Sequence, residues 1–332
     1  MLDIEDFDTV FPDSPEYSHE EVETIKSRRT QLGGKTFFER LLDLLQIKGR
    51  RLYPPQSPTG LSELHAKITE TPIALHYKHC LLFYLLKDLS PMHHADTEIA
   101  TKFAHDVHLD SKFWTFIEGL WALDHLQFET AVQNLTHPSI IPTFPDEIMI
   151  ALLNHRNLPN GTTNQEYILP MAYYNCAKPP LANKEAMTEF VKYMSDRSVT
   201  ETFYWIRGRA QHEQPLLFEI LVSTTFQRVG PNDRTNEAYK REDRAVELVS
   251  LPWNEDEETW LETYLLEGEG RNFHGARETV MMRRLATGKW GEAVGDHALR
   301  GKNKESLNWE VLKDGIRKGL GPREDGGNGF AI

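Results

Sequence analysis

Residues 119–140 constrain the fold of this chain more than any other stretch. Two apolar stripes with helical spacing occur in it, separated by a short break. They consist of Leu120, Trp121 and Leu123, and of Phe128, Ala131, Val132 and Leu135. So short a connection makes two helices antiparallel neighbours, and Ala131 is small enough to let their backbones approach. The pattern therefore predicts a helical hairpin, although buried hairpins occur in many all-helical proteins.

Helical patterns continue on both sides of this hairpin. Residues 76–88 are apolar almost all round, so this helix should be central and flanked by neighbours. Capping boxes of Ser18 with Glu21 and of Ser198 with Glu201 mark two helix starts. Residues 216–226 carry β-branched side chains that suit a strand, but the surrounding pattern favours helix. The sequence predicts an all-α fold, a solenoid-like stack of helical hairpins with an irregular C-terminal tail.

Three short motifs follow one another in a fixed order. They are a Tyr-Pro-Pro element at residues 53–55, a Lys-His helix closing on Leu-x-Asp at residues 78–88, and Gly-Leu-Trp-x-Leu-Asp-His at residues 119–125. Together they resemble the ELYS-like domain of nuclear pore proteins. Residues 178–181 and 198–207 are similar to its later part, so the resemblance spans roughly residues 36–225.

The resemblance implies a structural nucleoporin and no enzyme. It implies a scaffold in the outer-ring Y-complex, acting in pore assembly and in nucleocytoplasmic transport of mRNA and protein. Its expected partners are the other Y-complex nucleoporins, which are helical solenoids and β-propellers, and its expected location is the nuclear pore complex in the nuclear envelope. Large animal ELYS proteins add a β-propeller and a chromatin-binding region with AT-hooks. This sequence shows neither, so it resembles the compact fungal form, and chromatin targeting is not carried over.

Charge divides the chain into regions. Residues 1–25 hold nine Asp or Glu and no Lys or Arg, whereas residues 271–332 hold 12 Lys or Arg against 8 Asp or Glu. The whole chain carries −13, so residues 1–270 carry −17, which disfavours direct DNA binding by the main body. We predict an acidic flank at 1–34, a helical core at 35–228, C-terminal helices of the same domain at 229–270, and a basic Gly-rich tail at 271–332.

The apolar patterns of the tail, of the central helix and of the hairpin assign roles to two sets of residues. The tail contains an amphipathic segment that we expect to dock either on this chain or on a partner, through Val280, Met281, Leu285 and Trp290. The central helix and the hairpin supply residues expected to determine the fold instead of an interface. These are Tyr53, Tyr84, Trp121, Leu123, Asp124 and Phe128.

Motifs that carry chemistry are sparse. No Gly-x-Gly-x-x-Gly occurs, and Gly33-Gly34-Lys35-Thr36 lacks the preceding glycine and strand of a phosphate loop. A crude match to the metal site of an HD-type phosphohydrolase is formed by His79, His105, Asp106 and Asp124. A metal-dependent phosphohydrolase is therefore one alternative to the scaffold function. An adaptor built from helical repeats in another complex is the other. We predict no catalytic residue, cofactor or metal. The two cysteines lie in apolar helical patterns, and no apolar run has membrane-spanning length, so a reducing cytoplasmic or nuclear compartment is expected.

Overall fold

The chain folds into α-helices throughout the part that the structure describes. The computed structural model describes residues 2–12, 16–48, 52–90, 98–155, 168–226, 237–289 and 293. Sixteen α-helices and no strand occur in these residues, which confirms the predicted all-α class; residues 216–226 belong to a helix. None of these helices is long and apolar enough to cross a membrane. The chain divides into two compact units, residues 1–187 (unit 1) and 188–332 (unit 2).

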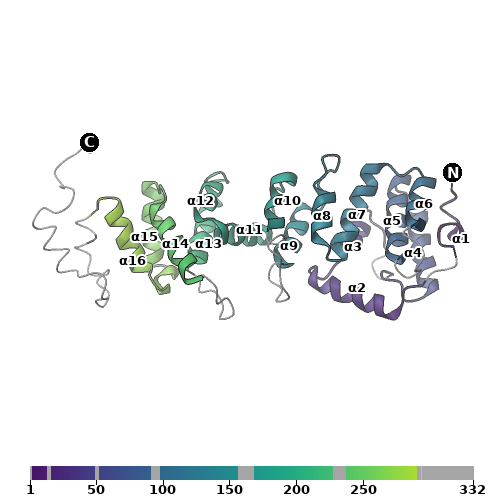
Figure 1. Ribbon diagram of the computed structural model, residues 1–332, viewed down its shortest axis with the longest axis horizontal. Coiled ribbons are helices and arrows are strands. Elements are labelled where there is room, and N and C mark those ends of the chain that lie inside the picture. The colour runs from purple at the N-terminus through teal and green to yellow at the C-terminus, as the bar shows by residue number, and fades with distance from the viewer. Residues whose placement is uncertain are drawn as a thin grey trace, which may run out of the picture. The chain divides into compact units, whose positions relative to one another are not determined.

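Unit 1 contains ten helices and the start of an eleventh (Figure 1). They are α1 (Phe7–Val10), α2 (His19–Gln31), α3 (Phe37–Leu44), α4 (Pro58–Glu70), α5 (Leu75–Leu89), α6 (Glu98–Asp106), α7 (Ser111–Asp124), α8 (Phe128–Leu135), α9 (Pro145–His155) and α10 (Leu169–Ala177). The division between the units falls inside α11 (Lys184–Arg197). It does not coincide with the predicted boundaries at residues 34, 228 and 270, and those ranges stay predictions.

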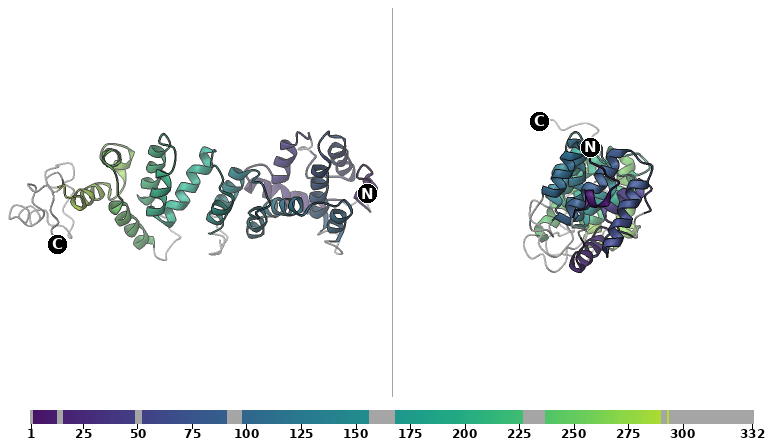
Figure 2. Two further views of the ribbon diagram at one scale, coloured as in Figure 1. Left: turned by 90° about the horizontal axis from the view of Figure 1, so that it is seen from above. Right: turned by 90° about the vertical axis from the view of Figure 1, so that its right-hand side faces the viewer.

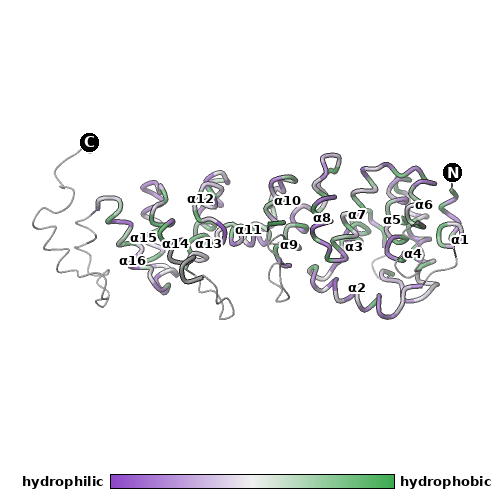
Figure 3. Tube along the Cα trace, viewed as in Figure 1, coloured by the Kyte–Doolittle hydropathy of each residue, from purple (hydrophilic) through white to green (hydrophobic). Residues whose placement is uncertain are grey.

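Helix α5 forms the centre of unit 1, as its apolar pattern predicts. Its residues 79–86 are all buried, and the helix contacts α4, α6 and α7. Surrounding a helix with neighbours is the only way to remove so much of its circumference from water. The hydropathy colouring in Figure 3 shows hydrophobic and hydrophilic stretches alternating along the outer helices, which bury one face only.

Helices α7 and α8 form the predicted hairpin, and they share a longer contact than any other two helices in the part of the chain that the structure describes. The connection turns at Leu126, which has a left-handed backbone with φ of 58°. Ala131 is fully buried, but the closest approach is at Gly119, where an added Cβ would lie 2.6 Å from Cγ of Leu135. A glycine thus sets this helix spacing, and its role was not predicted.

The acidic flank is inserted into unit 1. Its carboxylates are mostly exposed, whereas most of its apolar side chains are buried, with Phe11 at 0% exposure. Phe7 and Phe11 lie edge-on to the ring of His65 on α4, and Nε2 of His65 is 2.9 Å from the carbonyl oxygen of Ile4. Helix α2 begins with the predicted capping box of Ser18 and Glu21 and lies across the ends of its neighbours (Figures 1 and 2).

Unit 2 packs its helices around an aromatic cluster. After α11 come α12 (Val199–Arg207), α13 (Gln214–Phe226), α14 (Glu237–Ser250), α15 (Glu255–Leu266), the 3₁₀ turn η3 (Glu269–Asn272) and α16 (Ala276–Ala286). Trp253 lies between Phe203 and Phe218, with ring centroids 4.8 and 5.2 Å away. Such edge and tilted contacts stabilise more than the buried area alone.

Helix α16 is a packed helix of unit 2 and includes part of the amphipathic segment predicted within residues 271–332. It contacts α14 and α15, and Ala276 and Val280 are each 1% exposed. Apolar side chains at 276, 280 and 281 make one buried helical face, which packs the helix onto unit 2. Residues 290–292 and 294–332 lie outside the described residues.

Candidate functional site

Asp124 joins three helices of unit 1 through its carboxylate. One oxygen, Oδ1, accepts from the backbone N–H of Phe37 at 2.6 Å. The other, Oδ2, accepts from the N–H of Phe38 at 2.9 Å and from the Tyr84 hydroxyl at 2.7 Å. The side chain is 4% exposed. An anion at a helix N-terminus satisfies free N–H groups and interacts favourably with the helix dipole, so Asp124, at the end of α7, fixes the start of α3 against α5.

The environment of Asp124 acts on its proton affinity in two directions. Burial raises the pKa of this carboxyl from 3.8 to about 6, and the hydrogen bonds from Phe37, Phe38 and Tyr84 oppose the rise. Burial and nearby carboxylates raise the pKa of Tyr84 well above 10. The Tyr84 hydroxyl therefore stays neutral and keeps its hydrogen for Asp124.

Asp88, near the end of α5, makes a second buried junction. Its Oδ2 accepts from the hydroxyls of Tyr17 at 2.9 Å and Tyr53 at 3.0 Å. Its Oδ1 lies 3.3 Å from Nε2 of His125. Because Tyr17 directly precedes the cap of α2, this carboxylate ties the N-terminal segment to the central helix.

The six residues expected to determine the fold all lie in unit 1. Tyr53, Tyr84, Leu123, Asp124 and Phe128 are each at most 4% exposed. Trp121 differs, because it is only partly buried. Its indole stacks on His125 with centroids 3.8 Å apart, and Nζ of Lys87 lies 4.9 Å from the ring centroid. Their effect on stability stays a prediction.

The metal-site alternative finds no support in the geometry. Within the described part of the chain, no three His, Cys, Asp or Glu side chains are grouped so that they could hold a metal ion. His105 and Asp106 are exposed, whereas His79 is buried and edge-on to Phe103. Asp124 is occupied by the N-terminus of α3. These four side chains therefore do not converge on one site.

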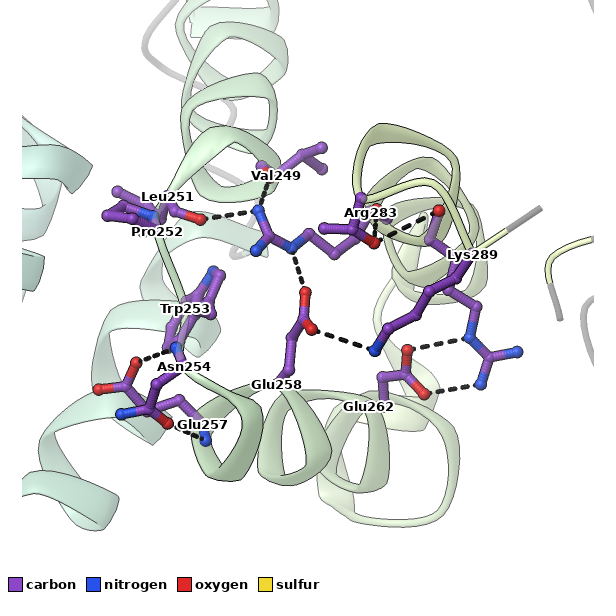
Figure 4. Close-up of polar contacts among 12 residues, drawn as sticks. Val249, Leu251, Pro252, Trp253, Asn254, Glu257, Glu258, Glu262, Arg283 and Lys289 are labelled. Carbon is purple, nitrogen blue, oxygen red and sulfur yellow. Dashed lines mark hydrogen bonds and ion pairs between the residues drawn. The ribbon is translucent and has the colours of Figure 1, made fainter. Parts of the chain in front are cut away.

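An ionic junction in unit 2 was not predicted from the sequence. The guanidinium of Arg283 on α16 donates to Glu258 on α15 at 2.7 Å and to the carbonyls of Val249 and Leu251, each at 2.7 Å (Figure 4). Lys289 lies 3.1 Å from the other oxygen of Glu258. Burial alone would raise the pKa of Glu258, but Arg283 and Lys289 outweigh it and lower that pKa.

Two further ion pairs surround this junction. Arg284 pairs with Glu262 at 2.6 Å. Arg207 on α12 donates to Glu257 at 2.5 and 3.1 Å and to the carbonyl of Pro252 at 2.8 Å. Glu257 also completes the capping box of α15 with Asn254. Long-range charge pairs leave no periodic trace, which is why sequence reasoning missed them.

The predicted docking residues lie in different environments. Val280 and Met281 are 1% and 4% exposed and are packed within unit 2; their docking on a partner stays a prediction. Leu285 is partly buried. Trp290 lies outside the described residues, so its docking role stays a prediction.

An apolar groove of about 640 Å³ opens on unit 1. Residues of α3, α5, α7 and the α8–α9 connection form its walls. They include Leu44, Tyr77, Phe113, Phe116 and Ile141. A cavity of this size is typical of binding pockets. One hint was present in the sequence, where Ile140 and Ile141 stand together in a loop between prolines.

Comparison with known proteins identifies the family. The family model described as "ELYS: Nuclear pore complex assembly" matches residues 35–268, from the residue before the N-cap of α3 to just past α15. The chain is also 28% identical over 156 residues to the uncharacterized protein ely5 of Schizosaccharomyces pombe. That similarity covers 46% of this chain and 47% of the relative, so it spans about half the relative's length. Because the family model matches well over half of the chain, the chain belongs to the ELYS family of nuclear pore complex assembly, which supports a location at the nuclear pore.

Proposed function

We propose that the chain is a structural, non-catalytic subunit of the outer-ring Y-complex of the nuclear pore, where it acts as a scaffold in pore assembly and in transport of mRNA and protein. The observation that carries the proposal is the family match over residues 35–268. This range contains helices α3–α15, and packed helices within each unit offer the large mixed surfaces that a scaffold needs.

The polar interior supports the same reading. Asp88, Asp124 and Glu258 bond to tyrosine hydroxyls, backbone N–H groups and an arginine of their own unit. Catalytic carboxylates face a cleft in which a substrate can reach them. Side chains occupied in this way stabilise a fold, so partners would contact the outer surface.

The partners we propose are the helical solenoid and β-propeller subunits of the Y-complex. Contact with DNA by the main body is not expected, because residues 1–270 carry a strong negative charge. Affinity purification of the tagged full chain tests the proposal. We expect Y-complex nucleoporins to be recovered in stoichiometric amounts and the tagged chain to lie at the nuclear rim.

Two results would contradict the proposal. Recovery of an unrelated complex without rim localisation would indicate a helical adaptor of another pathway. Stoichiometric metal in the purified protein, together with phosphohydrolase activity, would indicate the enzyme alternative. An Asp124→Asn variant would then lose activity and metal together, whereas a scaffold would lose only stability.

A further inference from the structure

We infer that an apolar groove of unit 2 is the docking site for a later segment of this same chain, residues 306–320, which binds there as an amphipathic helix. The inference does not depend on the proposed function. Residues 306–320, the C-terminal segment, lie beyond the range matched by the family model, 35–268. Both the groove and its occupant are therefore argued from this chain alone.

The unit 2 groove has a volume of about 250 Å³ and lies between α13, α14 and α16. Its floor is buried, with Thr225, Phe226 and Thr279 at most 7% exposed. Its rim carries Val246 on α14 and Met282 on α16, which are 65% and 46% exposed. Among the described residues of unit 2, four large hydrophobic side chains are exposed, and these are two of them. Exposed hydrophobic side chains on both sides of a groove indicate an interaction surface.

Contacts deeper in unit 2 hold the walls of the groove in place. Helix α14 contacts both α13 and α16. Next to Met282, Arg283 on α16 donates to the carbonyl of Val249 on α14 at 2.7 Å. Phe226 stacks on Phe273, with ring centroids 5.6 Å apart and planes 7° apart. Because the groove is formed before a ligand arrives, binding to it costs less conformational entropy.

The sequence after α16 contains a segment that suits this groove. Residues 306–320 lie outside the described residues. Four large apolar side chains recur in them at intervals of three and four positions, namely Trp309, Leu312, Ile316 and Leu320. This spacing predicts one apolar face of a helix. Ser306 precedes the face, and Gly321 with Pro322 follows it, which are usual start and stop signals of a helix.

The two flanks of the predicted apolar face differ in a way that fits the groove. On a helix, Gly315 and Gly319 border the face on one side, and Lys313 and Arg317 border it on the other. Glycines let the backbone of a helix approach a neighbouring surface closely. The basic flank is complementary to Glu278, an exposed carboxylate that lines the groove.

Net charge also favours this segment as the occupant. Residues 188–270 hold 9 Lys or Arg and 17 Asp or Glu, a balance of −8. Residues 299–323, which contain the C-terminal segment, hold 7 Lys or Arg and 3 Asp or Glu, a balance of +4. Opposite charges attract the segment to the body of unit 2 and help to fix its orientation.

The connection to α16 favours the chain's own segment over that of a second copy. Residues 287–305, 19 in number, join the end of α16 to the segment. An irregular chain of this length has a root-mean-square span of about 24 Å. The groove residues Met282 and Glu278 lie only about 6 and 12 Å along the axis of α16 from Ala286. The tether therefore reaches the groove and holds the segment at a roughly millimolar effective concentration, which a second copy in dilute solution does not match.

Hydrogen exchange of the full chain, followed by mass spectrometry, tests the inference. Val246→Glu and Met282→Glu each place a carboxylate on the rim of the groove without removing a buried side chain. Ile316→Glu places one in the apolar face of the segment. Leu216→Glu is the control for the groove, because Leu216 is 37% exposed in unit 2 and does not line it. Leu307→Glu is the control for the segment, because position 307 lies opposite position 316 on a helix.

We expect the amides of residues 308–319 in the wild-type chain to exchange at least about tenfold more slowly than their intrinsic rate. Two glycines make an isolated helix of this sequence unstable, so such protection reports docking. Val246→Glu, Met282→Glu and Ile316→Glu should each restore the intrinsic rate, whereas both controls should keep the protection. Exchange of α13 should stay at the wild-type rate in every variant, which shows that unit 2 remains folded.

Three results would overturn the inference. Exchange of the segment at its intrinsic rate in the wild-type chain would show that it does not dock. Protection that survives both groove variants would place the segment on another surface. Protection that disappears on dilution would identify a second copy as the source of the bound segment. None of these results bears on the proposed function, which affinity purification tests separately.

Discussion

Each unit joins its helices through a carboxylate, but the two carboxylates have different kinds of partner. In unit 1, Asp124 is a buried carboxylate that accepts hydrogen bonds from two backbone N–H groups and the Tyr84 hydroxyl, all of them neutral donors. In unit 2, Glu258 meets Arg283 and Lys289 directly. The pKa of Asp124 is raised and that of Glu258 is lowered. Acid should therefore stabilise the junction at Asp124 and destabilise the junction at Glu258.

Removing the cation of unit 2 should have the largest effect. Arg283→Ala leaves Glu258 without its closest partner and the carbonyls of Val249 and Leu251 without their donor. We expect a loss of about 3 to 5 kcal/mol in the free energy of unfolding, because breaking a buried pair strands a charge. Urea denaturation followed by circular dichroism measures it. Arg277→Ala on the exposed side of α16 is the control and should change little.

Removing the anion of unit 1 should cost somewhat less. Asp124→Asn keeps the size of the side chain but replaces one accepting oxygen by an NH₂ donor. In one orientation of the amide this donor faces the N–H of Phe37, and in the other it faces the N–H of Phe38 and the Tyr84 hydroxyl, so at least one hydrogen bond is lost. We expect a loss of about 3 kcal/mol, and faster hydrogen exchange in α3 than in unit 2. Equal acceleration in both units would show that they do not unfold independently.

The seam of the hairpin offers a contrast that involves no charge. Gly119→Ala places a Cβ 2.6 Å from Cγ of Leu135, so either the Leu135 side chain or the spacing of α7 and α8 must change. Overpacking outweighs the gain in helix propensity, and we expect a net loss of about 1 to 2 kcal/mol. In Gly60→Ala on α4 the nearest atom is 3.4 Å away, so a melting temperature equal to or above wild type is expected for this control.

The pH dependence distinguishes the two carboxylates. The pKa of Asp124 in the folded chain, about 6, lies above its ordinary 3.8, so the folded state binds the proton more tightly. The proton bound to Asp124 therefore adds to the free energy of unfolding. This contribution is complete below pH 3.8 and is lost as the pH rises through about 6. Between about pH 5 and 7.5 unit 1 should lose about 1 kcal/mol, and Asp124→Asn should abolish this slope.

Glu258 should behave in the reverse way. Its folded pKa lies below the ordinary 4.5, so its stabilisation is present above pH 4.5 and disappears as pH falls through the lowered value. Hydrogen exchange of α15, corrected for the intrinsic rate, reports it. Stronger protection of α15 at pH 4 than at pH 6 would contradict the assignment.

The smallest effect is expected at the edge of the ionic junction. Lys289 is 41% exposed, so solvent screens its bond to Glu258. Lys289→Ala should cost at most about 1 kcal/mol, and the difference from wild type should shrink when salt is added. A cost as large as that of Arg283→Ala would place Lys289 at the centre of the junction.

Periodicity predicted the helices and the central position of α5, because both follow from which side chains avoid water. Periodicity could not predict that Asp124 anchors α3, because Asp124 lies 87 and 86 positions from its donors Phe37 and Phe38. The predicted acidic flank at residues 1–34 made no statement about its packing. A count of acidic residues does not take account of the spaced apolar residues of this segment. Ile4, Val10 and Phe11 are at most 7% exposed.

The insertion of the N-terminal segment bears on how this protein should be cut for experiments. A fragment that starts at residue 35, where similarity to the family begins, would lack Tyr17 and leave Asp88 with one fewer hydroxyl donor. It would also uncover the side of α4 that carries His65. Poor solubility of such a fragment would then reflect a missing piece of the folded body. A detection tag fused ahead of residue 2 calls for a spacer, because the chain enters the hydrophobic interior within a few residues.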